Sequence, residues 1–168
     1  MKPSDARICT RIERAMRLMV DTNVLVRLRD KNSPQLVECE RAIELLIDGE
    51  HELYLCTQAL IEFWSVATRP LEANGLGRSI EQAYSDCHLF LDTMPLLEEP
   101  PDIAHRWLEL VRHYEVKGKE VHDARLVAFS VAHSIPYILT LNPDDFSRYQ
   151  EVTAVTPAKL IEQLAGGE

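Results

Sequence analysis

The chain has 168 residues, of which 46% are hydrophobic and 27% are charged, and its formal net charge is −9. These values are ordinary for one soluble globular domain with a proper hydrophobic core. The negative charge argues against broad electrostatic adhesion to nucleic acid, for which proteins normally use a basic face. A nucleic-acid substrate is still compatible with it where bound cations neutralise an acidic cleft.

The cysteine pattern and the lack of long apolar runs indicate in which cellular compartment the protein is found. The four cysteines lie far apart and form no CxxC pair, so we expect reduced thiols rather than a zinc site or disulfides. No apolar run approaches the length of a membrane span, and the first residues lack the apolar segment of a signal peptide. We therefore expect a cytoplasmic protein that does not enter the membrane.

Residues 1–15 are charged and show little apolar periodicity. They are predicted to be an N-terminal extension, either a frayed tail or the product of a start codon placed upstream of the true one at Met16. A short basic arm that touches RNA is the less favoured alternative. The remaining residues, 16–168, are predicted to form one domain.

Short apolar strands alternate with helices along this domain. A strand over 17–20 precedes a short helix over 23–29, and Ser33-Pro34 then starts a helix that ends at Gly49. Further strands are predicted at 53–56, 94–97, 137–140 and 152–155, and further helices at 59–68, 79–91, 101–114, 124–133 and 157–165. This alternation predicts an α/β fold with a parallel sheet of about five strands covered by helices on both faces. We expect the strand order 3-2-1-4-5.

Four acidic residues stand where this topology can bring them together. Asp21 ends the first strand, and Glu62 lies one turn into the helix after the second strand. Asp123 lies at the start of the 124–133 helix, and Asp145 follows the fourth strand. If the first and fourth strands are neighbours, their carboxyl ends meet at the switch point of the sheet, where α/β proteins bind ligands.

Carboxylates gathered in one cleft repel and raise one another's pKa unless cations lie between them. Oxygen-only ligand sets suit Mg²⁺ or Mn²⁺, and no pattern of histidine and cysteine here favours zinc. Such a cluster fits phosphodiester hydrolysis, in which metal ions activate water and neutralise charge on the attacked phosphate.

Each acid also has a simpler explanation. Asp21, Asp123 and Asp145 could each cap the helix or turn that follows, and Glu62 could lie on a solvated helix flank. Burying Glu62 among its apolar neighbours would be costly without a partner. Capping does not predict that all four acids share one edge of the sheet, so we favour a joint site.

Other candidates for function have weaker support. His122 could act as a general base beside Asp123, although a surface histidine is the commoner case. No GxSxG, GxxxxGK[ST] or GxGxxG motif supports a serine hydrolase, a P-loop NTPase or a dinucleotide enzyme. A modest basic rim for an RNA backbone could be formed by Arg27, Arg29, Lys117, Lys119 and Arg125.

From about residue 17 to the C-terminus, the chain resembles the PIN domain, and within it the VapC-type toxin ribonucleases of toxin–antitoxin systems. The stretches that carry the resemblance are Val20 to Leu25, Glu62 within Leu60 to Phe63, His122 to Ala128, Leu139 to Asn142, and Asp145-Phe146. The first stretch alone is weak evidence. All of them in this order and spacing are fairly specific.

The resemblance implies a Rossmann-like PIN domain with Mg²⁺- or Mn²⁺-dependent endoribonuclease activity, usually dimeric. Asp21, Glu62 and Asp123 would map onto the family's metal-binding acids. Water held by the metals would attack the phosphorus and leave 5′-phosphate and 3′-hydroxyl ends. The resemblance also implies a small antitoxin partner whose C-terminal segment covers the acidic cleft.

The chain departs from the commonest family pattern after the fourth strand. An acid often stands there at the position of Asn142, and Asp145 would take over the second-metal role, which leaves the number of metals open. Thr22 or Asn23 would assist through water or phosphate contacts, and Thr140 and Asn142 are further candidates for assisting the substrate. The alternative is a PIN-like module that binds RNA or protein and does not cut.

Overall fold

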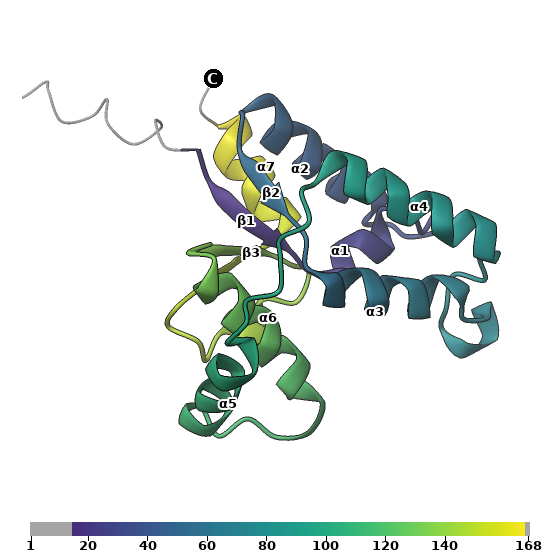
Figure 1. The fold of residues 1–168 in the computed structure, drawn as a ribbon. Helices are drawn as coiled ribbons and strands as arrows, with labels where there is room; N and C mark the ends of the chain where they lie inside the picture. The colour runs from purple at the N-terminus through teal and green to yellow at the C-terminus, as the bar shows by residue number, and fades with distance from the viewer. Residues whose placement is uncertain (1–14, 167–168) are drawn as a thin grey trace, which may run out of the picture.

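A computed structural model describes residues 15–166, so nearly all of the predicted N-terminal extension 1–15 lies outside the described residues. The fold is α/β, as predicted, with one parallel sheet in the order β2-β1-β3-β4 (Figure 1). Its strands are β1 (Arg17–Val20), β2 (Glu52–Tyr54), β3 (Tyr137–Leu139) and β4 (Thr153–Val155). Within this part of the chain, no helix is both long and apolar enough to cross a membrane.

The predicted third strand at 94–97 is wrong, because this segment makes only a single bridge, between Leu96 and Leu55. The Leu55 N–H donates to the Pro95 carbonyl (2.9 Å), and the Leu97 N–H donates to the Leu55 carbonyl (3.0 Å). Pro95 has no N–H with which to extend a ladder. The predicted strand order is otherwise confirmed, since the bridge places this segment beyond β2.

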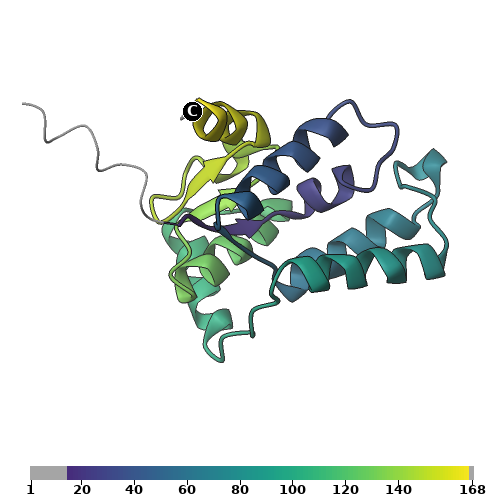
Figure 2. The same ribbon diagram turned by 90° about the horizontal axis from the view of Figure 1, so that it is seen from above.

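Helices cover both faces of the sheet. Figures 1 and 2 show α2 and α7 on one face and α6 on the other, with α5 packed against α6, while α3 and α4 lie side by side and extend past the sheet. The helices are α1 (Thr22–Arg27), α2 (Leu36–Asp48), α3 (Thr57–Thr68), α4 (Ile80–Thr93), α5 (Ile103–His113), α6 (Val121–Ala132) and α7 (Pro157–Ala165). Short 3₁₀ turns are η1 (Leu71–Ala73), η2 (Gly118–Glu120) and η3 (Pro143–Phe146).

The central strand β1 is the reason that the site forms where it does. Leu18, Met19 and Val20 are fully buried, as expected for a strand with helices on both faces. Val20 is in register with Leu139 of β3, so the two strands end at the same level. The chain leaves β1 toward β2 on one side and later returns to β3 on the other, which makes this edge the switch point.

A buried ion cluster joins α4 to the end of α1. Asp86 of α4 is only 5% exposed. Its Oδ1 lies 3.1 Å from Arg29 Nε and accepts from Arg78 Nη2 at 3.0 Å, while its Oδ2 contacts Arg78 Nε. The Arg29 guanidinium also lies over the ring of Phe90. The half-buried Arg29 side chain is therefore engaged in this cluster and does not form part of a rim for RNA.

Candidate metal centre

Asp21 lies at the carboxyl end of β1, where the strand passes into α1. Its backbone N–H continues the sheet by donating to the Leu139 carbonyl (3.0 Å). Its Oδ1 accepts from the Thr22 N–H (2.8 Å), and its Oδ2 accepts from the Thr140 hydroxyl (2.8 Å). Asp21 thus caps α1, as the simpler explanation proposed, and both of its oxygens are held at the edge of the sheet.

The hydroxyl of Thr140 is itself oriented by its neighbours. Thr140 is fully buried, and its oxygen accepts from Asn23 Nδ2 (3.1 Å) and from the Asn142 N–H (3.1 Å). A hydroxyl has one proton to donate. Because the lone pairs of the Thr140 oxygen accept from Asn23 and Asn142, its proton is directed to Asp21. Asn23 also accepts from the Leu141 N–H (3.1 Å). These residues fix Asp21 between β1 and β3.

Glu62 of α3 is half-buried and contacts the start of α1. Its Oε2 accepts from the Thr22 hydroxyl (2.8 Å), and its Oε1 accepts from Gln58 Nε2 (2.8 Å). Glu62 therefore is not on a freely solvated flank. Thr22 links it to Asp21, because the Thr22 backbone holds one acid and the Thr22 side chain holds the other.

Asp123 lies in the first turn of α6, which begins at Val121 and not at the predicted position 124. The residue in the N-cap position is Glu120, so Asp123 does not cap this helix. Asp145 is exposed within η3. One small pocket brings Asp21, Glu62 and Asp123 together; its full lining is Asp21, Thr22, Cys56, Gln58, Ala59, Glu62, His122, Asp123 and Leu126.

The electrostatics of this pocket oppose full ionisation of the acids. Burial raises the pKa of Asp21 to about 6 against the lowering effect of the Thr140 and Thr22 donors, and the charges of Glu62 and Asp145 add to the rise. Burial also raises the pKa of Asp123 to about 7, with the charges of Asp21, Asp145 and Glu62 as further causes. Asp145 thus lies near enough to act on both acids, although it does not line the pocket.

The chemistry of these donors fits a hard divalent cation. All are carboxylate oxygens, the ligands that Mg²⁺ and Mn²⁺ prefer. A cation would offset the burial and the acid–acid repulsion that raise the pKa of Asp21 and of Asp123. Within residues 15–166, no three His, Cys, Asp or Glu side chains are spaced as a bound ion requires. Placing three carboxylates on one ion therefore requires side-chain movement at this pocket.

Sequence reasoning missed Gln58, which lines the pocket, and Glu99, which contacts Arg125 beside it. Gln58 Nε2 donates to the His122 carbonyl (3.1 Å) as well as to Glu62, and its Oε1 accepts from Arg125 Nη1 (2.9 Å). Arg125 Nη2 bonds both oxygens of Glu99 (2.8 and 2.7 Å). The four-residue spacing of Gln58 and Glu62 on one helix face was the signal available in the sequence.

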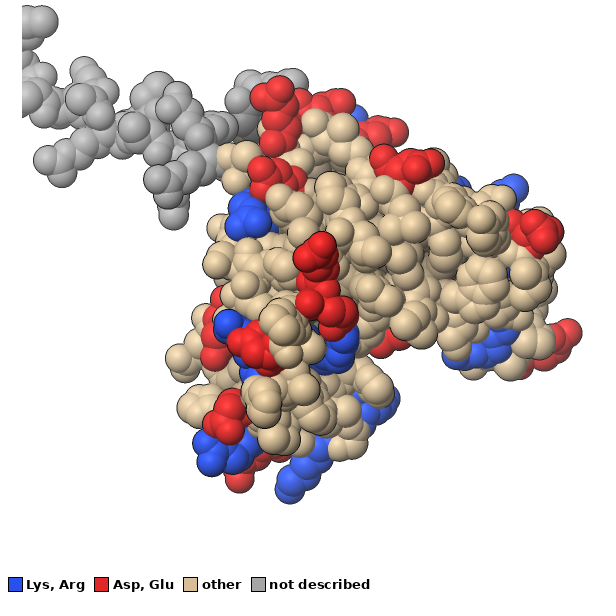
Figure 3. Space-filling view, viewed as in Figure 1, with Lys and Arg blue, Asp and Glu red and all other residues tan. Residues whose placement is uncertain are grey.

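The proposed basic rim is largely engaged elsewhere. Arg27 pairs with Asp30, and Arg125 pairs with Glu99. On the face seen in Figure 3, the described Lys and Arg side chains alternate with acidic ones instead of forming one basic surface. Of the five residues proposed, Lys117 and Lys119 on or beside η2 are those with no ion pair among the described residues.

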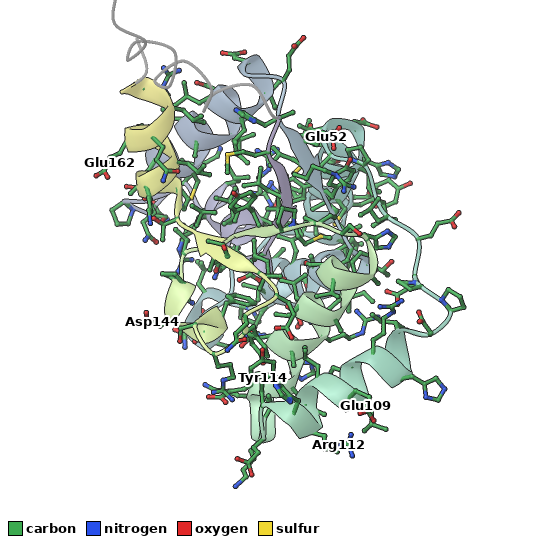
Figure 4. The ribbon with its side chains drawn as sticks, turned by 90° about the vertical axis from the view of Figure 1, so that its left-hand side faces the viewer. Glu52, Glu109, Arg112, Tyr114, Asp144 and Glu162 are labelled. Carbon is green, nitrogen blue, oxygen red and sulfur yellow. The ribbon has the colours of Figure 1, made fainter. Side chains whose placement is uncertain are left out.

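A second surface hollow, lined by Glu109, Leu110, Arg112, His113 and Glu151, shares no residue with the acidic pocket. Figure 4 places Glu109 and Arg112 on the outer side of α5, away from the sheet. Its charges are mixed, and Arg112 already pairs with Glu109. This hollow therefore adds nothing to the acid site.

Thr140→Val is expected to lower the free energy of unfolding by about 1–3 kcal/mol, because it removes the donor to the Asp21 carboxylate and the acceptor of the half-buried Asn23 amide. Urea unfolding with EDTA present measures the change. Thr68→Val is the matched control, since the Thr68 hydroxyl donates only to a carbonyl of its own helix. Equal losses in the two variants would show that Thr140 has no special supporting role.

Comparison with known proteins agrees with this architecture. Residues 18–152 match the family model of the PIN domain. Among solved structures, the chain is similar to VapBC2 from Rickettsia felis, bound to a DNA fragment from its promoter (TM-score 0.65, 17% identity, covering 83% of this chain and 97% of that one). It is also similar to VapBC-1 from nontypeable Haemophilus influenzae (TM-score 0.63, 15% identity, covering 84% of this chain and 98% of that one). A third similar structure is a toxin–antitoxin complex from Klebsiella pneumoniae (TM-score 0.58, 21% identity, covering 83% of this chain and 97% of that one). At these identities the structural likeness is one of fold, and no curated protein matches.

Proposed function

Because this chain belongs to the PIN domain family, we propose that it is a nuclease, and specifically an endoribonuclease that uses Mg²⁺ or Mn²⁺ to hydrolyse RNA phosphodiester bonds. The observation that carries the proposal is the pocket in which three separate segments of the chain place Asp21, Glu62 and Asp123 side by side. Burial and neighbouring acids raise the pKa of Asp21 and of Asp123 in this pocket, as is typical of functional sites.

In this proposal the chain's own residues hold and orient the metal-binding oxygens. Thr140 and Thr22 fix Asp21, and Thr22 with Gln58 fixes Glu62. Asp123 completes the set from α6, and Asp145 is the candidate for a second metal. A bound divalent cation would lower the pKa of its water and offset charge on the attacked phosphate. The expected products carry 5′-phosphate and 3′-hydroxyl ends.

Cleavage assays with defined substrates test the proposal. RNA is incubated with the purified protein and Mg²⁺, Mn²⁺ or EDTA, and single-stranded DNA of the same sequence serves as the comparison. We expect RNA cleavage with either metal and none with EDTA. Undiminished cleavage in EDTA would refute the metal role, and equal cleavage of DNA would refute the RNA preference.

Metal uptake is expected to weaken steeply as the pH falls from 8 to 5. A carboxylate must be ionised to bind the cation, and the pKa values of about 6 for Asp21 and about 7 for Asp123 place the loss in this window. With their ordinary value of 3.8, the same acids would stay ionised down to pH 5. Calorimetric titration with Mn²⁺ at several pH values measures the effect, and constant affinity down to pH 5 would contradict it.

We also propose that the chain is the toxin of a type II toxin–antitoxin pair, acting in the cytoplasm as a homodimer. The support is that the similar structures include VapBC assemblies and a toxin–antitoxin complex. Growth arrest on production of the wild-type chain alone, absent for Asp21→Ala, is the expected result. Sedimentation of the purified protein tests the dimer.

A PIN-like module that binds RNA or protein without cutting is the second candidate. Two observations favour it: Asn142 stands where an acid is common in the family, and the described acids are not spaced around an ion. Calorimetry separates the two candidates, because a decayed site takes up no Mn²⁺ tightly. Tight uptake together with metal-dependent cleavage would exclude this second candidate.

A further inference from the structure

We infer that Gln58 is a positioning residue for Glu62 and that Arg125 sets the orientation of the Gln58 amide. The inference rests on the proposed function, because it concerns how the acid site is held ready for a cation. Neither residue would touch the metal. They would act through the carboxylate of Glu62 and through the backbone beside Asp123.

Every polar atom of the Gln58 amide has a matching partner. Its nitrogen carries two protons and donates to Glu62 Oε1 (2.8 Å) and to the His122 carbonyl (3.1 Å). Its oxygen accepts from Arg125 Nη1 (2.9 Å). A flipped amide would place its oxygen against the Glu62 carboxylate and its nitrogen against a guanidinium, which can only donate. Arg125 therefore selects the orientation that serves Glu62.

The Gln58 amide also joins the two halves of the site. Glu62 comes from α3, and the His122 carbonyl belongs to the residue directly before Asp123 in α6. Since Thr22 holds the other oxygen of Glu62 (2.8 Å), that carboxylate is fixed at both ends. Removing Gln58 frees one end of Glu62 and breaks a link between the segments that supply two of the three pocket acids.

Arg125 is held in turn by Glu99, which lies between α4 and α5 and accepts two bonds from Arg125 Nη2 (2.8 and 2.7 Å). The guanidinium thus donates to Gln58 from Nη1 and to Glu99 from Nη2. This division needs the planar fork of arginine, which a lysine ammonium does not reproduce. Arg125→Lys keeps the charge near the site and removes the geometry.

Gln58→Met tests the inference, with Gln35→Met as the matched control. Both glutamines are half-buried and accept a bond from an arginine, but Gln35 does so from Arg27, away from the pocket. We expect Gln58→Met to bind Mn²⁺ about 10-fold more weakly by calorimetry and to lower kcat for RNA with little change in KM. Gln35→Met is expected to match the wild type in both measurements.

A double-mutant cycle isolates the part played by Arg125. Arg125→Lys is expected to weaken Mn²⁺ binding about 3-fold in the wild type and to have no further effect on top of Gln58→Met, because its influence passes through the amide. Additive losses in the double variant would overturn this part of the inference. Unchanged Mn²⁺ affinity in Gln58→Met would overturn the whole.

A metal-free crystal structure of Gln58→Met separates this inference from the proposed function. We expect Glu62 Oε1 to leave its wild-type position in Gln58→Met, with Oε2 still bonded to Thr22, whereas both oxygens keep their positions in Gln35→Met. If the wild type neither takes up Mn²⁺ nor cleaves RNA, the proposed function fails, and this structure still decides whether Gln58 positions Glu62. An unchanged position of Glu62 Oε1 in Gln58→Met would refute the positioning role.

Discussion

Asp123→Asn is expected to reduce RNA cleavage by about 10²–10³-fold, the loss typical of removing one group that stabilises developing charge. The change keeps the size of the side chain and removes the negative charge that a cation would bind. Because Asp123 lies within the first turn of α6 and does not cap the helix, the substitution leaves the helix start intact. Gel-based cleavage of RNA under saturating Mg²⁺ measures the loss.

The same substitution is expected to stabilise the metal-free protein at pH 8. Burial and neighbouring acids raise the pKa of Asp123 from its ordinary 3.8 to about 7. An acid with a raised pKa contributes its full stability below about pH 4 and loses it as the pH rises through 7. Asparagine carries no charge at pH 8 and so avoids the free-energy cost of ionising an acid at this position. We expect a gain of about 1–2 kcal/mol in the free energy of unfolding after discounting for solvent screening of this half-exposed side chain.

Urea unfolding in EDTA at pH 8 and pH 5 tests both the sign and the size of the stability change caused by Asp123→Asn. The gain from Asp123→Asn is expected to shrink at pH 5, where most Asp123 side chains in the wild type are already protonated. Asp92→Asn, at an exposed position of α4, controls for simple loss of charge. Its free energy of unfolding is expected to stay within about 0.5 kcal/mol of the wild-type value at both pH 8 and pH 5. A destabilised Asp123→Asn variant with full cleavage activity would show that Asp123 is structural and not part of the site.

Asp86→Ala is expected to cost about 3–5 kcal/mol of folding free energy, a large share of a typical domain's total. The aspartate is 5% exposed and contacts both Arg29 and Arg78. Its removal leaves two largely buried guanidinium groups without their counter-charge. The loss should also loosen α4 from the end of α1, since this cluster joins them.

Urea or thermal unfolding measures the effect of Asp86→Ala, and Asp102→Ala is the control. Asp102 also pairs with an arginine, Arg106 (2.8 Å), but both side chains are exposed. Exposed pairs contribute little, so this control is expected to unfold like the wild type. Similar behaviour of the two variants would show that the buried cluster adds no more than a surface pair.

The local pattern of the sequence predicted most of the fold, and its failures have identifiable causes. Apolar runs separated by helices predicted the parallel sheet and its order. The 94–97 segment looked apolar enough to be a strand. Because Pro95 has no backbone N–H to donate, the segment forms only one bridge with its neighbour. The start of α6 was placed too late because its N-cap residue, Glu120, makes no side-chain capping bond and is not a typical capping residue.

The candidate acids were predictable because strand ends of a parallel sheet meet at one edge. What supports the acids was not predictable, since it depends on pairs far apart in the chain. Gln58 meets Arg125 across 67 residues, and Arg29 meets Asp86 only once α4 has packed. A basic rim looked reasonable from composition, whereas the fold directs Arg29 inward and engages Arg125 with Glu99.

The hydrogen bond between Thr140 and Asp21 spans 119 positions of the chain, and this has a consequence for synthesis. Domains fold as the ribosome releases them, and closing so long a segment is slow compared with forming a helix. While the chain is still short, Asp21 has no partner across the sheet and α6 has not emerged. A nascent chain therefore carries no assembled acid site, and any cleaving activity begins only after most of the polypeptide has left the exit tunnel.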